Sequence, residues 1–493
     1  MFDTATPESL GIPSRAISEF LSFCKRRGSY THSMLFMRHG KIIAEGYHAP
    51  YDVNSLNRMY SQTKSFVSVA IGCLLDEGKI SLDDKICDYF TDRIPHELPP
   101  YLAEQTIREM LTMTTSIYKE PVWFTAGDPD RVHLYFDKGD GVRPSGTVWR
   151  YDSAGSQVLS ALVERLSGMS LLDYLRKRLF SYTGGFESAQ MLKTPNGESW
   201  GDSAMLCTLR DMATFGNLVM HYGKHEKKQL VSEAYLREAT SPLVCNDTSA
   251  LYHVFHYGYG YQIWCTEQGG FAFVGMGDQL TVCLPEHDFL FTMTADNQGA
   301  PALRQLIISA LFDIVVASMK PEALPECPED YAALTQTLSH LSLRCMPYGK
   351  RSSFWEKICS KKFYAEPNPT GIKWVSLNVF EDEGVLTYEN QSGEKCLDFG
   401  IGFNFRGRFP EPGYSDEVGT CPGAEDFRYR CATSLGFVEE RKCLLRVQII
   451  DRYLGNLSVT FAFKDENTVT VHMEKTAEHF LKEYEGEFTA HSL

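Results

Sequence analysis

The chain has 493 residues, of which 43% are apolar, and its 63 acidic and 48 basic residues give a formal net charge of −15. This length exceeds the usual size of one compact domain, so we expect two. The acidic balance, without a basic patch, argues against a nucleic-acid partner, because such binding needs a basic surface.

Neither the N-terminus nor the longest late apolar stretch carries a secretion or membrane signal. Residues 1–20 lack a basic segment followed by an apolar one, and the stretch at 302–319 is interrupted by Arg304 and Asp313. We therefore expect a cytoplasmic protein without membrane association, whose fourteen cysteines are reduced thiols. No zinc-ligand spacing, H-E-x-x-H motif or P-loop occurs, so we expect neither a metal nor another cofactor.

Apolar periodicity predicts the elements of the first 320 residues in chain order. Two strands flank a turn at His39–Gly40, four helices follow, and a group of strands then precedes a last helix. The strands are expected at 33–38, 41–47, 259–265, 270–275, 279–285 and 289–295, and the helices at 61–78, 106–113, 153–168, 209–223 and 302–319. Strands joined by short turns predict an antiparallel sheet that helices cover. Residues 117–148, rich in Gly, Pro and Asp, are predicted to form a long irregular loop.

A proline-rich segment at 320–330 marks the predicted boundary between two domains. Beyond it, short strand patterns dominate and predict a small antiparallel barrel or sandwich. The domains are expected at 1–320 and 366–493, with a partly helical linker at 321–365. The predicted fold class is α/β in the α+β sense, with a helical subdomain beside the first sheet.

Ser61 and Lys64 stand three residues apart at the start of an apolar helical pattern. Residues i and i+3 share one face of a helix, so their hydroxyl and amine are expected to be neighbours. A serine becomes a good nucleophile when a base takes its proton, and a lysine serves as that base where burial or a nearby cation favours its neutral form. From this motif alone the structural interpretation is favoured, in which Ser61 caps the helix and Lys64 is solvated.

The surrounding sequence changes this balance, because several segments resemble the serine β-lactamase and penicillin-binding-protein superfamily. The similarity is greatest to its class C-like branch, which includes D,D-peptidases, esterases and 6-aminohexanoate-dimer hydrolases. It extends over about residues 5–318, in the family's order. The segments are MYSQTKSF (59–66), VAIGCLLDEGKISLDDKICDYF (69–90), TIREMLTMTTS (106–116), WRYDSAGSQVLSALVERLSGMSLLDYL (149–175) and GMGDQLTVCLPEHDF (275–289).

The resemblance implies catalytic roles for three residues. Ser61 would attack a carbonyl and form an acyl-enzyme, and Lys64 would accept the serine proton. Tyr151 would pass a proton to the leaving group or activate the deacylating water, which requires a nearby cation because tyrosine ordinarily ionises near pH 10. Ser153 would complete the hydrogen-bond network. The structural alternatives are that Tyr151 is a packed aromatic and that Ser153 caps the following helix.

The third motif of the family is altered in this chain. Where relatives carry Lys-Thr-Gly or His-x-Gly, the sequence reads Met276-Gly277-Asp278-Gln279. A lysine there would attract a substrate carboxylate, whereas Met276 cannot and Asp278 would repel one. We therefore expect no true β-lactamase activity. The oxyanion hole is expected from backbone N–H groups of Ser61 and of a residue near Gln279, with Gly277 beside it; the alternative is that Gln279 faces solvent.

Residues of the long loop and a second serine motif complete the candidate set. Trp123 and His133 are candidates for lining the substrate cleft. The sequence Y-D-S-A-G resembles half of a G-x-S-x-G nucleophile elbow at Ser153, but that motif requires a strand directly before it. The residues before it, 141–150, read as a loop, so this interpretation is disfavoured.

Together these patterns predict a serine hydrolase that cleaves an amide in a small molecule or short peptide. An ester substrate is the alternative within the same fold. The alternative from another class is a binding or scaffold protein with the C-terminal β domain as its interaction module. A homodimer is left open, as is a role for the C-terminal domain in covering the cleft.

Overall fold

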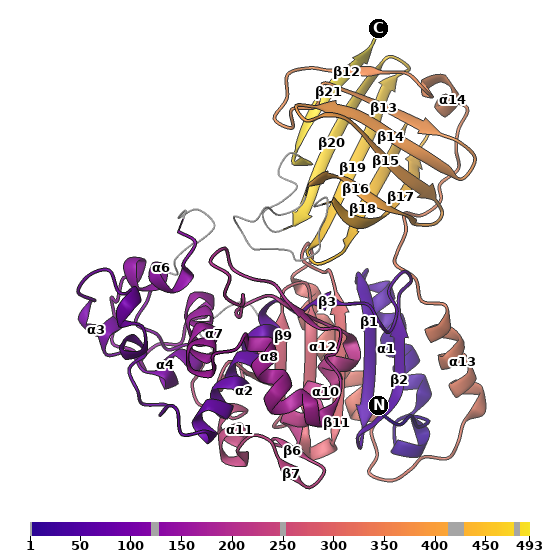
Figure 1. Cartoon of the computed structure of the whole chain (residues 1–493). Helices are drawn as coiled ribbons and strands as arrows, with labels where there is room; N and C mark the ends of the chain where they lie inside the picture. Colours follow the sequence, from indigo (N-terminus) through magenta and orange to yellow (C-terminus); the bar gives the residue numbers. More distant parts are fainter. Residues whose placement is uncertain (1, 120–127, 247–252, 413–427, 478–483) are drawn as a thin grey trace. The chain divides into compact units, whose positions relative to one another are not determined.

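The computed structural model describes residues 2–119, 128–246, 253–412, 428–477 and 484–493 (Figure 1). The described residues before Leu343 form one compact unit, and those from Leu343 on form a second. Helix α13 (Pro328–Ser339), which lies within the expected linker, belongs to the first unit. The chain just after it bonds to that unit, because Leu341 O accepts a hydrogen bond from Ala49 N at 3.0 Å.

An antiparallel sheet forms the centre of the first unit, as the sequence predicts. In the described residues it has six strands in the order β2-β1-β11-β10-β9-β8 (Figure 1). Strand β8 keeps only two residues of the predicted strand at 259–265. The bounds are β1 (Thr31–Arg38), β2 (Lys41–Tyr47), β8 (Trp264–Cys265), β9 (Phe271–Gly275), β10 (Gln279–Leu284) and β11 (Phe289–Ala295).

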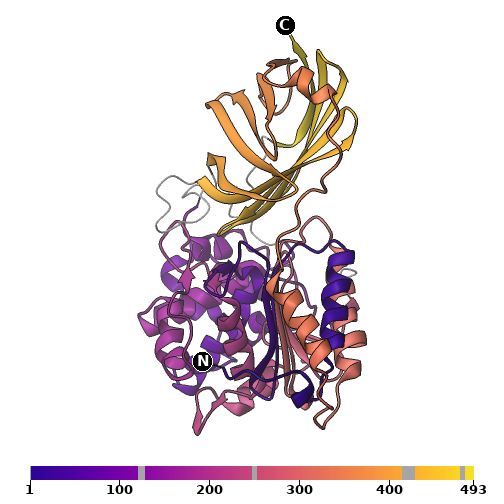
Figure 2. The ribbon, with the colours of Figure 1, turned by 90° about the vertical axis from the view of Figure 1, so that its right-hand side faces the viewer.

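Both faces of this sheet are buried, because side chains that alternate along each strand enter two different cores. In β1, Met34 and Phe36 join one core, whereas Leu35 and Met37 join the other. Figure 2 shows the sheet edge-on between the two layers of helices. The first layer comprises α1 (Ser14–Arg26), α12 (Ala302–Ala310) and α13, and the second includes α2 (Thr63–Asp76), α7 (Ser153–Ser167), α8 (Leu171–Leu175), α10 (Leu209–Met220) and α11 (Glu233–Ala239). None of the helices in the described ranges combines the length and apolar character needed to cross a bilayer.

Helix α2 is the most enclosed helix of the second layer. Every residue from Thr63 to Leu74 is buried, as expected for a helix that packs on all sides. Gly72 lets α11 approach closely, since a Cβ there would lie 2.5 Å from the Tyr235 ring. The start of α2 is therefore held inside the protein.

The first unit also contains several short helices and strands. One of them, α6, lies within residues 117–148, so the prediction of an irregular loop is wrong there. The Asp130 side chain starts α6 by accepting hydrogen bonds from Val132 N and His133 N. These elements are α3 (Pro100–Ala103), α4 (Ile107–Leu111), α6 (Arg131–Lys138), α9 (Ser181–Thr183), β3 (Asn57–Arg58), β4 (Gln190–Met191), β5 (Met205–Cys207), β6 (Lys224–His225) and β7 (Lys228–Gln229).

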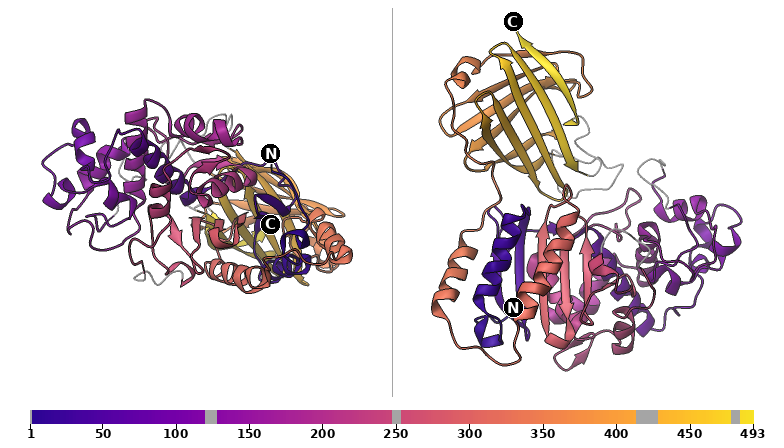
Figure 3. Two further views of the ribbon diagram at one scale, coloured as in Figure 1. Left: turned by 90° about the horizontal axis from the view of Figure 1, so that it is seen from below. Right: turned by 180° about the vertical axis from the view of Figure 1, so that it is seen from behind.

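The second unit is a barrel, which decides between the two predicted β architectures. Nine described strands follow the order β15-β14-β13-β12-β21-β20-β19-β18-β17, and β17 closes the circle by pairing in parallel with β15. Figure 3 shows the barrel from behind in its right-hand view. Residues 396–405 carry one of the strand patterns of this domain as a single run, but the structure splits it at Gly402, whose φ is 83°. The elements are α14 (Phe354–Ile358), β12 (Phe363–Ala365), β13 (Trp374–Val379), β14 (Glu383–Asn390), β15 (Gly393–Ile401), β16 (Phe405–Pro412), β17 (Arg428–Glu439), β18 (Lys442–Ile450), β19 (Leu454–Asp465), β20 (Thr468–Ala477) and β21 (Gly486–Ser492).

The buried His32 in β1 and the partly buried His48 just after β2 predict acid lability. Burial lowers the pKa of His32 to about 3 and that of His48 to about 4. The unfolded chain binds protons at these side chains near pH 6.5 while the folded chain does not. Stability is therefore complete above pH 6.5 and is lost as pH falls, by about 2 kcal/mol for each histidine between pH 7 and pH 5.

Urea unfolding at several pH values tests this expectation. His32→Phe keeps an aromatic ring against Tyr51, whose ring stacks on His32 at 4.2 Å, and removes the titrating group. Its unfolding free energy should depend less steeply on pH than that of the wild type. The exposed His96 serves as the control through His96→Gln, and an equal slope in His32→Phe and wild type would contradict the prediction.

Candidate active site

Ser61 lies in a tight turn immediately before α2, not at the N-cap of the helix. Strand β3 leads into a 3-10 turn at Tyr60–Gln62, and Tyr60 adopts a φ of 48°. The N-cap of α2 is Gln62, with no capping bond from its side chain. The interpretation of Ser61 as a helix cap is therefore wrong, and the turn directs its hydroxyl to the first turn of α2.

Lys64 is the partner of that hydroxyl. Its Nζ donates a hydrogen bond to Ser61 Oγ at 3.1 Å and another to the Asp202 backbone carbonyl at 2.7 Å. The Asp202 carboxylate lies 4.0 Å from the same nitrogen. Only 2% of the Lys64 side chain is exposed, so the alternative of a solvated helix lysine is wrong. A buried amine in contact with a hydroxyl is the arrangement that nucleophile activation requires.

Tyr151 also lies beside the Lys64 amine. The Lys64 nitrogen is 5.1 Å from the centroid of the Tyr151 ring, and that ring stacks on Trp264 at 5.9 Å. The structure thus brings Ser61, Lys64 and Tyr151 together from the segments around the starts of α2 and α7, which are far apart in sequence. The proton-transfer role of Tyr151 stays a prediction.

Asp152, next to Tyr151, caps helix α7. Its carboxylate accepts a hydrogen bond from Gly155 N at 2.8 Å, so the alternative that Ser153 is the cap is wrong. Burial raises the pKa of the Asp152 carboxyl, and the nearby Lys64 charge opposes part of that rise. Ser153 is the first residue of α7 and is partly exposed, and its place in the hydrogen-bond network stays a prediction.

A turn at residues 199–203 delivers Asp202 to Lys64, and sequence reasoning missed it. Gln157 holds the turn from α7, because its side-chain amide donates to Ser199 O at 3.0 Å and accepts from Gly201 N at 2.9 Å. Arg58, three residues before Ser61, donates from Nε to Ser203 O at 2.9 Å. The W-G-D-S sequence at 200–203 is only a weak likeness to a nucleophile elbow, which does not predict a contact with Lys64.

The third-motif segment forms the turn between β9 and β10. Gly277 and Asp278 both have positive φ, 75° and 69°, as a tight hairpin turn requires. Gln279 is fully buried, and its side-chain amide donates to Ala295 O at 2.6 Å and to Met276 O at 3.0 Å. The alternative of a solvent-facing Gln279 is therefore wrong, while Met276 is partly exposed at the turn.

Asp278 does not present a free negative charge to the site. Its carboxylate accepts hydrogen bonds from Arg304 Nε at 2.7 Å and from Asn297 Nδ2 at 2.9 Å, and it is buried. This ion pair neutralises the charge that we expected to repel a substrate carboxylate. Arg304 therefore offsets the charge of Asp278, while the effect of Asp278 on a substrate carboxylate stays a prediction.

The turn packs directly against the chain that carries Ser61. A Cβ on Gly275, at the end of β9, would lie 2.2 Å from Met59 O. Glycine at this position therefore lets the end of β9 contact the residue two before Ser61. The participation of backbone N–H groups near Gln279 in an oxyanion hole stays a prediction.

Comparison with known proteins decides the family. The family model described as Beta-lactamase matches residues 23–313, which is more than half of the chain. The chain belongs to the β-lactamase family. It is a serine hydrolase of the kind that cleaves amides or esters.

Relatives agree with this assignment. The 6-aminohexanoate-dimer hydrolase of Paenarthrobacter ureafaciens is 25% identical over 305 residues, which cover 56% of this chain and 76% of that protein. A candidate 6-aminohexanoate-dimer hydrolase from Bacillus anthracis has a TM-score of 0.52 at 19% identity, over 66% of this chain and 89% of that one. The hydrolase EstCE1, described with promiscuous acyltransferase activity, has a TM-score of 0.50 at 14% identity, over 61% of this chain and 99% of that one.

Three further candidates from the sequence remain: His133, Trp123 and the nucleophile elbow at Ser153. His133 lies on α6, and its Nδ1 is 2.6 Å from Asp128 Oδ2. Trp123 lies outside the described residues. A cleft-lining role for either residue stays a prediction. The nucleophile elbow at Ser153 is excluded, because the residues just before it form no strand and the sheet is antiparallel.

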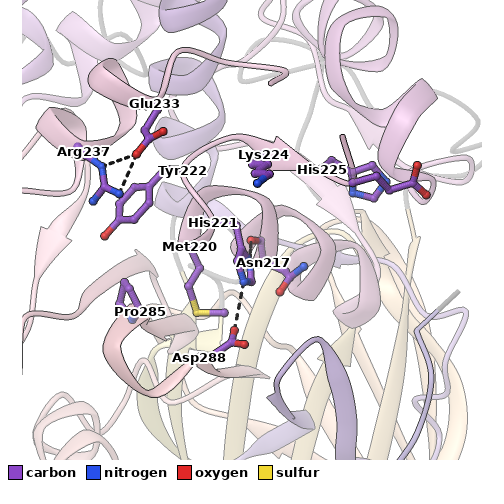
Figure 4. Close-up of a pocket in the computed structure, with 11 residues that line it drawn as sticks. Asn217, Met220, His221, Tyr222, Lys224, His225, Glu233, Arg237, Pro285 and Asp288 are labelled. Carbon is purple, nitrogen blue, oxygen red and sulfur yellow. Dashed lines mark hydrogen bonds and ion pairs between the residues drawn. The ribbon is translucent and has the colours of Figure 1, made fainter. Parts of the chain in front are cut away.

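An open cavity of about 630 Å³ lies elsewhere in this unit, between the end of α10, the β6–β7 hairpin and the turn after β10 (Figure 4). There the hydrogen bond to Asp288 raises the pKa of His221, whose Nδ1 also donates to Asn217 O at 2.9 Å. The described residues lining this cavity include no serine, threonine or cysteine. Asp288 lies just after the last residue of β10, whereas Gln279 is the first residue of that strand. This cavity is therefore separate from the Ser61 site.

The contact at Gly275 predicts that a single added methyl group disturbs the Ser61 turn. In Gly275→Ala the new Cβ must push β9 away from Met59 O, because 2.2 Å is far below van der Waals contact. We expect a loss of about 1–3 kcal/mol in unfolding free energy and a slower reaction of Ser61 with a fluorophosphonate.

Chemical denaturation and labelling kinetics measure the two effects. Gly407→Ala in the barrel is the matched control, since a Cβ there would lie 3.6 Å from the Phe405 ring, an ordinary contact. Wild-type stability and labelling in Gly275→Ala would show that the close approach does not support the site.

Proposed function

We propose that this protein hydrolyses an amide of a small molecule or short peptide through an acyl-enzyme on Ser61. The observation that carries the proposal is the hydrogen bond of 3.1 Å between the buried Lys64 amine and Ser61 Oγ. Such a pair supplies a nucleophile and its base within direct proton-transfer distance.

The reaction would begin when Ser61 Oγ attacks the substrate carbonyl and its proton passes to Lys64 Nζ. The tetrahedral intermediate would then expel the amine, which takes up a proton that Tyr151 relays from Lys64. Water would attack the resulting ester with the same groups acting in reverse, releasing the acid and restoring Ser61. The position of Tyr151 beside the Lys64 amine supports this relay.

The altered third motif supports a substrate without an obligatory carboxylate. Met276 carries no charge, and the nearby Arg304 is bonded to Asp278. A β-lactam substrate, which presents a carboxylate, is therefore disfavoured. Cleavage of an ester is the second candidate, because the same acyl transfer serves both and a solved relative of the same fold is described as a hydrolase with acyltransferase activity.

Labelling by a fluorophosphonate tests the nucleophile. Wild-type protein should become covalently modified at Ser61, and Ser61→Ala should not, with intact mass and peptide mapping as the measurement. Ser153→Ala is the matched control, since Ser153 begins α7 and we expect labelling to persist in it. Failure of the wild type to label, or equal labelling of Ser61→Ala, would instead favour a non-catalytic binding or scaffold protein.

Replacement of Lys64 tests the base. Lys64→Ala should lose acylation by a factor of about 100 or more, because the Ser61 hydroxyl then loses the amine that lies 3.1 Å from it. A thermal melt establishes that the variant is folded, and stopped-flow acylation with an activated ester gives the rate. A burst of wild-type size in folded Lys64→Ala would refute the role of Lys64.

A further inference from the structure

The side chain of Asp202 has no role in the mechanism described so far, although its backbone carbonyl anchors Lys64. Its Oδ2 lies 4.0 Å from Lys64 Nζ, with 6% of the Asp202 side chain exposed. Its Oδ1 is also buried and has no hydrogen-bond partner among the described residues. An ionised carboxylate is costly to bury unless an opposite charge compensates it. Lys64 is the cation that the described structure pairs with it.

The placement of this carboxylate is built into the fold. The turn that carries Asp202 is held by Gln157 and Arg58 through the bonds given above, and Met205 N donates to Thr63 Oγ1 at 3.1 Å just beyond it. Gly201 packs so closely on Ser160 that a Cβ would lie 2.1 Å away. The turn is thus fixed both to α7 and to the segment around Ser61.

Among the described residues, three ionisable side chains contact the Lys64 amine or interact with its charge: Asp202, Asp152 and Tyr151. The Asp152 carboxylate already accepts the hydrogen bond from Gly155 N that caps α7. Tyr151 presents its ring to the amine, 5.1 Å from centroid to nitrogen. Of the described carboxylates, Asp202 is the one with an oxygen within ion-pair distance of the amine nitrogen, at 4.0 Å.

We infer that Asp202 is a positioning residue whose carboxylate stabilises the ammonium formed when Lys64 takes the proton of Ser61. This inference rests on the proposed function. As the bond from Ser61 Oγ to the acyl carbon or phosphorus forms, the Oγ–H bond breaks and its proton moves to Lys64 Nζ. The charge that appears on the nitrogen lies beside the fixed carboxylate, so this step becomes more favourable.

The Asp202 carboxylate should affect the rate of acylation in two opposing ways. The carboxylate speeds proton transfer once Lys64 is a free amine, but it also favours the ammonium in the resting protein. Two opposite charges about 4 Å apart favour each other by roughly fivefold even in bulk water, and by more in a buried site. Removing the carboxylate should therefore lower the maximal rate and, at the same time, extend activity to lower pH.

The test measures the rate of fluorophosphonate labelling at Ser61 from pH 5 to pH 10. In Asp202→Asn, which keeps the backbone carbonyl and the side-chain size, we expect the plateau rate to fall about tenfold. The acidic limb should move down by about one pH unit. In the labelling reaction itself, the bond between Ser61 Oγ and phosphorus forms, the P–F bond breaks and fluoride leaves. Asp202→Glu, which restores the charge, should move the limb back toward the wild-type position.

Asp211→Asn is the matched control. Asp211 is equally buried, but it bonds to Thr208 N and Phe186 N at the start of α10. Its removal should leave the acidic limb in place, because no Lys64 contact is lost.

The outcomes separate the inference from the proposed function. If wild-type protein does not label, the proposed function fails. If it labels and Asp202→Asn shows an unchanged limb, or a slower rate without a shift, the inference alone is overturned. Unfolding of both Asp202 variants in thermal melts would also overturn it, since Asp202 would then serve the fold.

Discussion

The candidate site depends on keeping the amine of Lys64 buried within hydrogen-bond distance of Ser61. Burial of a lysine is costly, because its charged form loses hydration. The structure offsets this cost with the Asp202 carbonyl at 2.7 Å, the Ser61 hydroxyl at 3.1 Å and the face of the Tyr151 ring. Each of these groups has to be placed by a different part of the fold.

The helices and the sheet divide this task between them. Helix α2 is enclosed on every side, so its first turn cannot move into solvent. The sheet supports the segment that carries Ser61, where Gly275 at the end of β9 approaches Met59. Helix α7 begins beside Tyr151, and its Gln157 holds the turn that carries Asp202. The site is therefore assembled where the helical subdomain meets the sheet.

The third-motif turn keeps a structural role in this chain, although it lacks the lysine that would bind a substrate carboxylate. Its polar groups are engaged within the fold, with Asp278 bonded to Arg304 and Gln279 to the end of β11. These bonds fix the β9–β10 hairpin against the Ser61 segment but leave Met276 as the partly exposed side chain. In this β-lactamase-family chain, the groups placed for acyl transfer are therefore separable from a group that would bind a substrate carboxylate.

The sequence by itself determined the features that arise from nearby residues. The helical spacing of Ser61 and Lys64, the antiparallel strands with their turn at His39–Gly40, and a β-rich second unit all follow from local periodicity and turn chemistry. The place of Tyr151 beside this pair followed from resemblance, which carries tertiary information that periodicity lacks.

Only the tertiary structure decided the contacts between distant segments. Asp202 meets Lys64 across 138 positions of sequence, and Arg304 neutralises Asp278 across 26. Helix α6 within the expected loop depends on the Asp130 cap and on packing against α7, and the barrel depends on the parallel pairing of β17 with β15. Such contacts leave no local pattern, because a side chain's charge and burial depend on which distant segments fold against it.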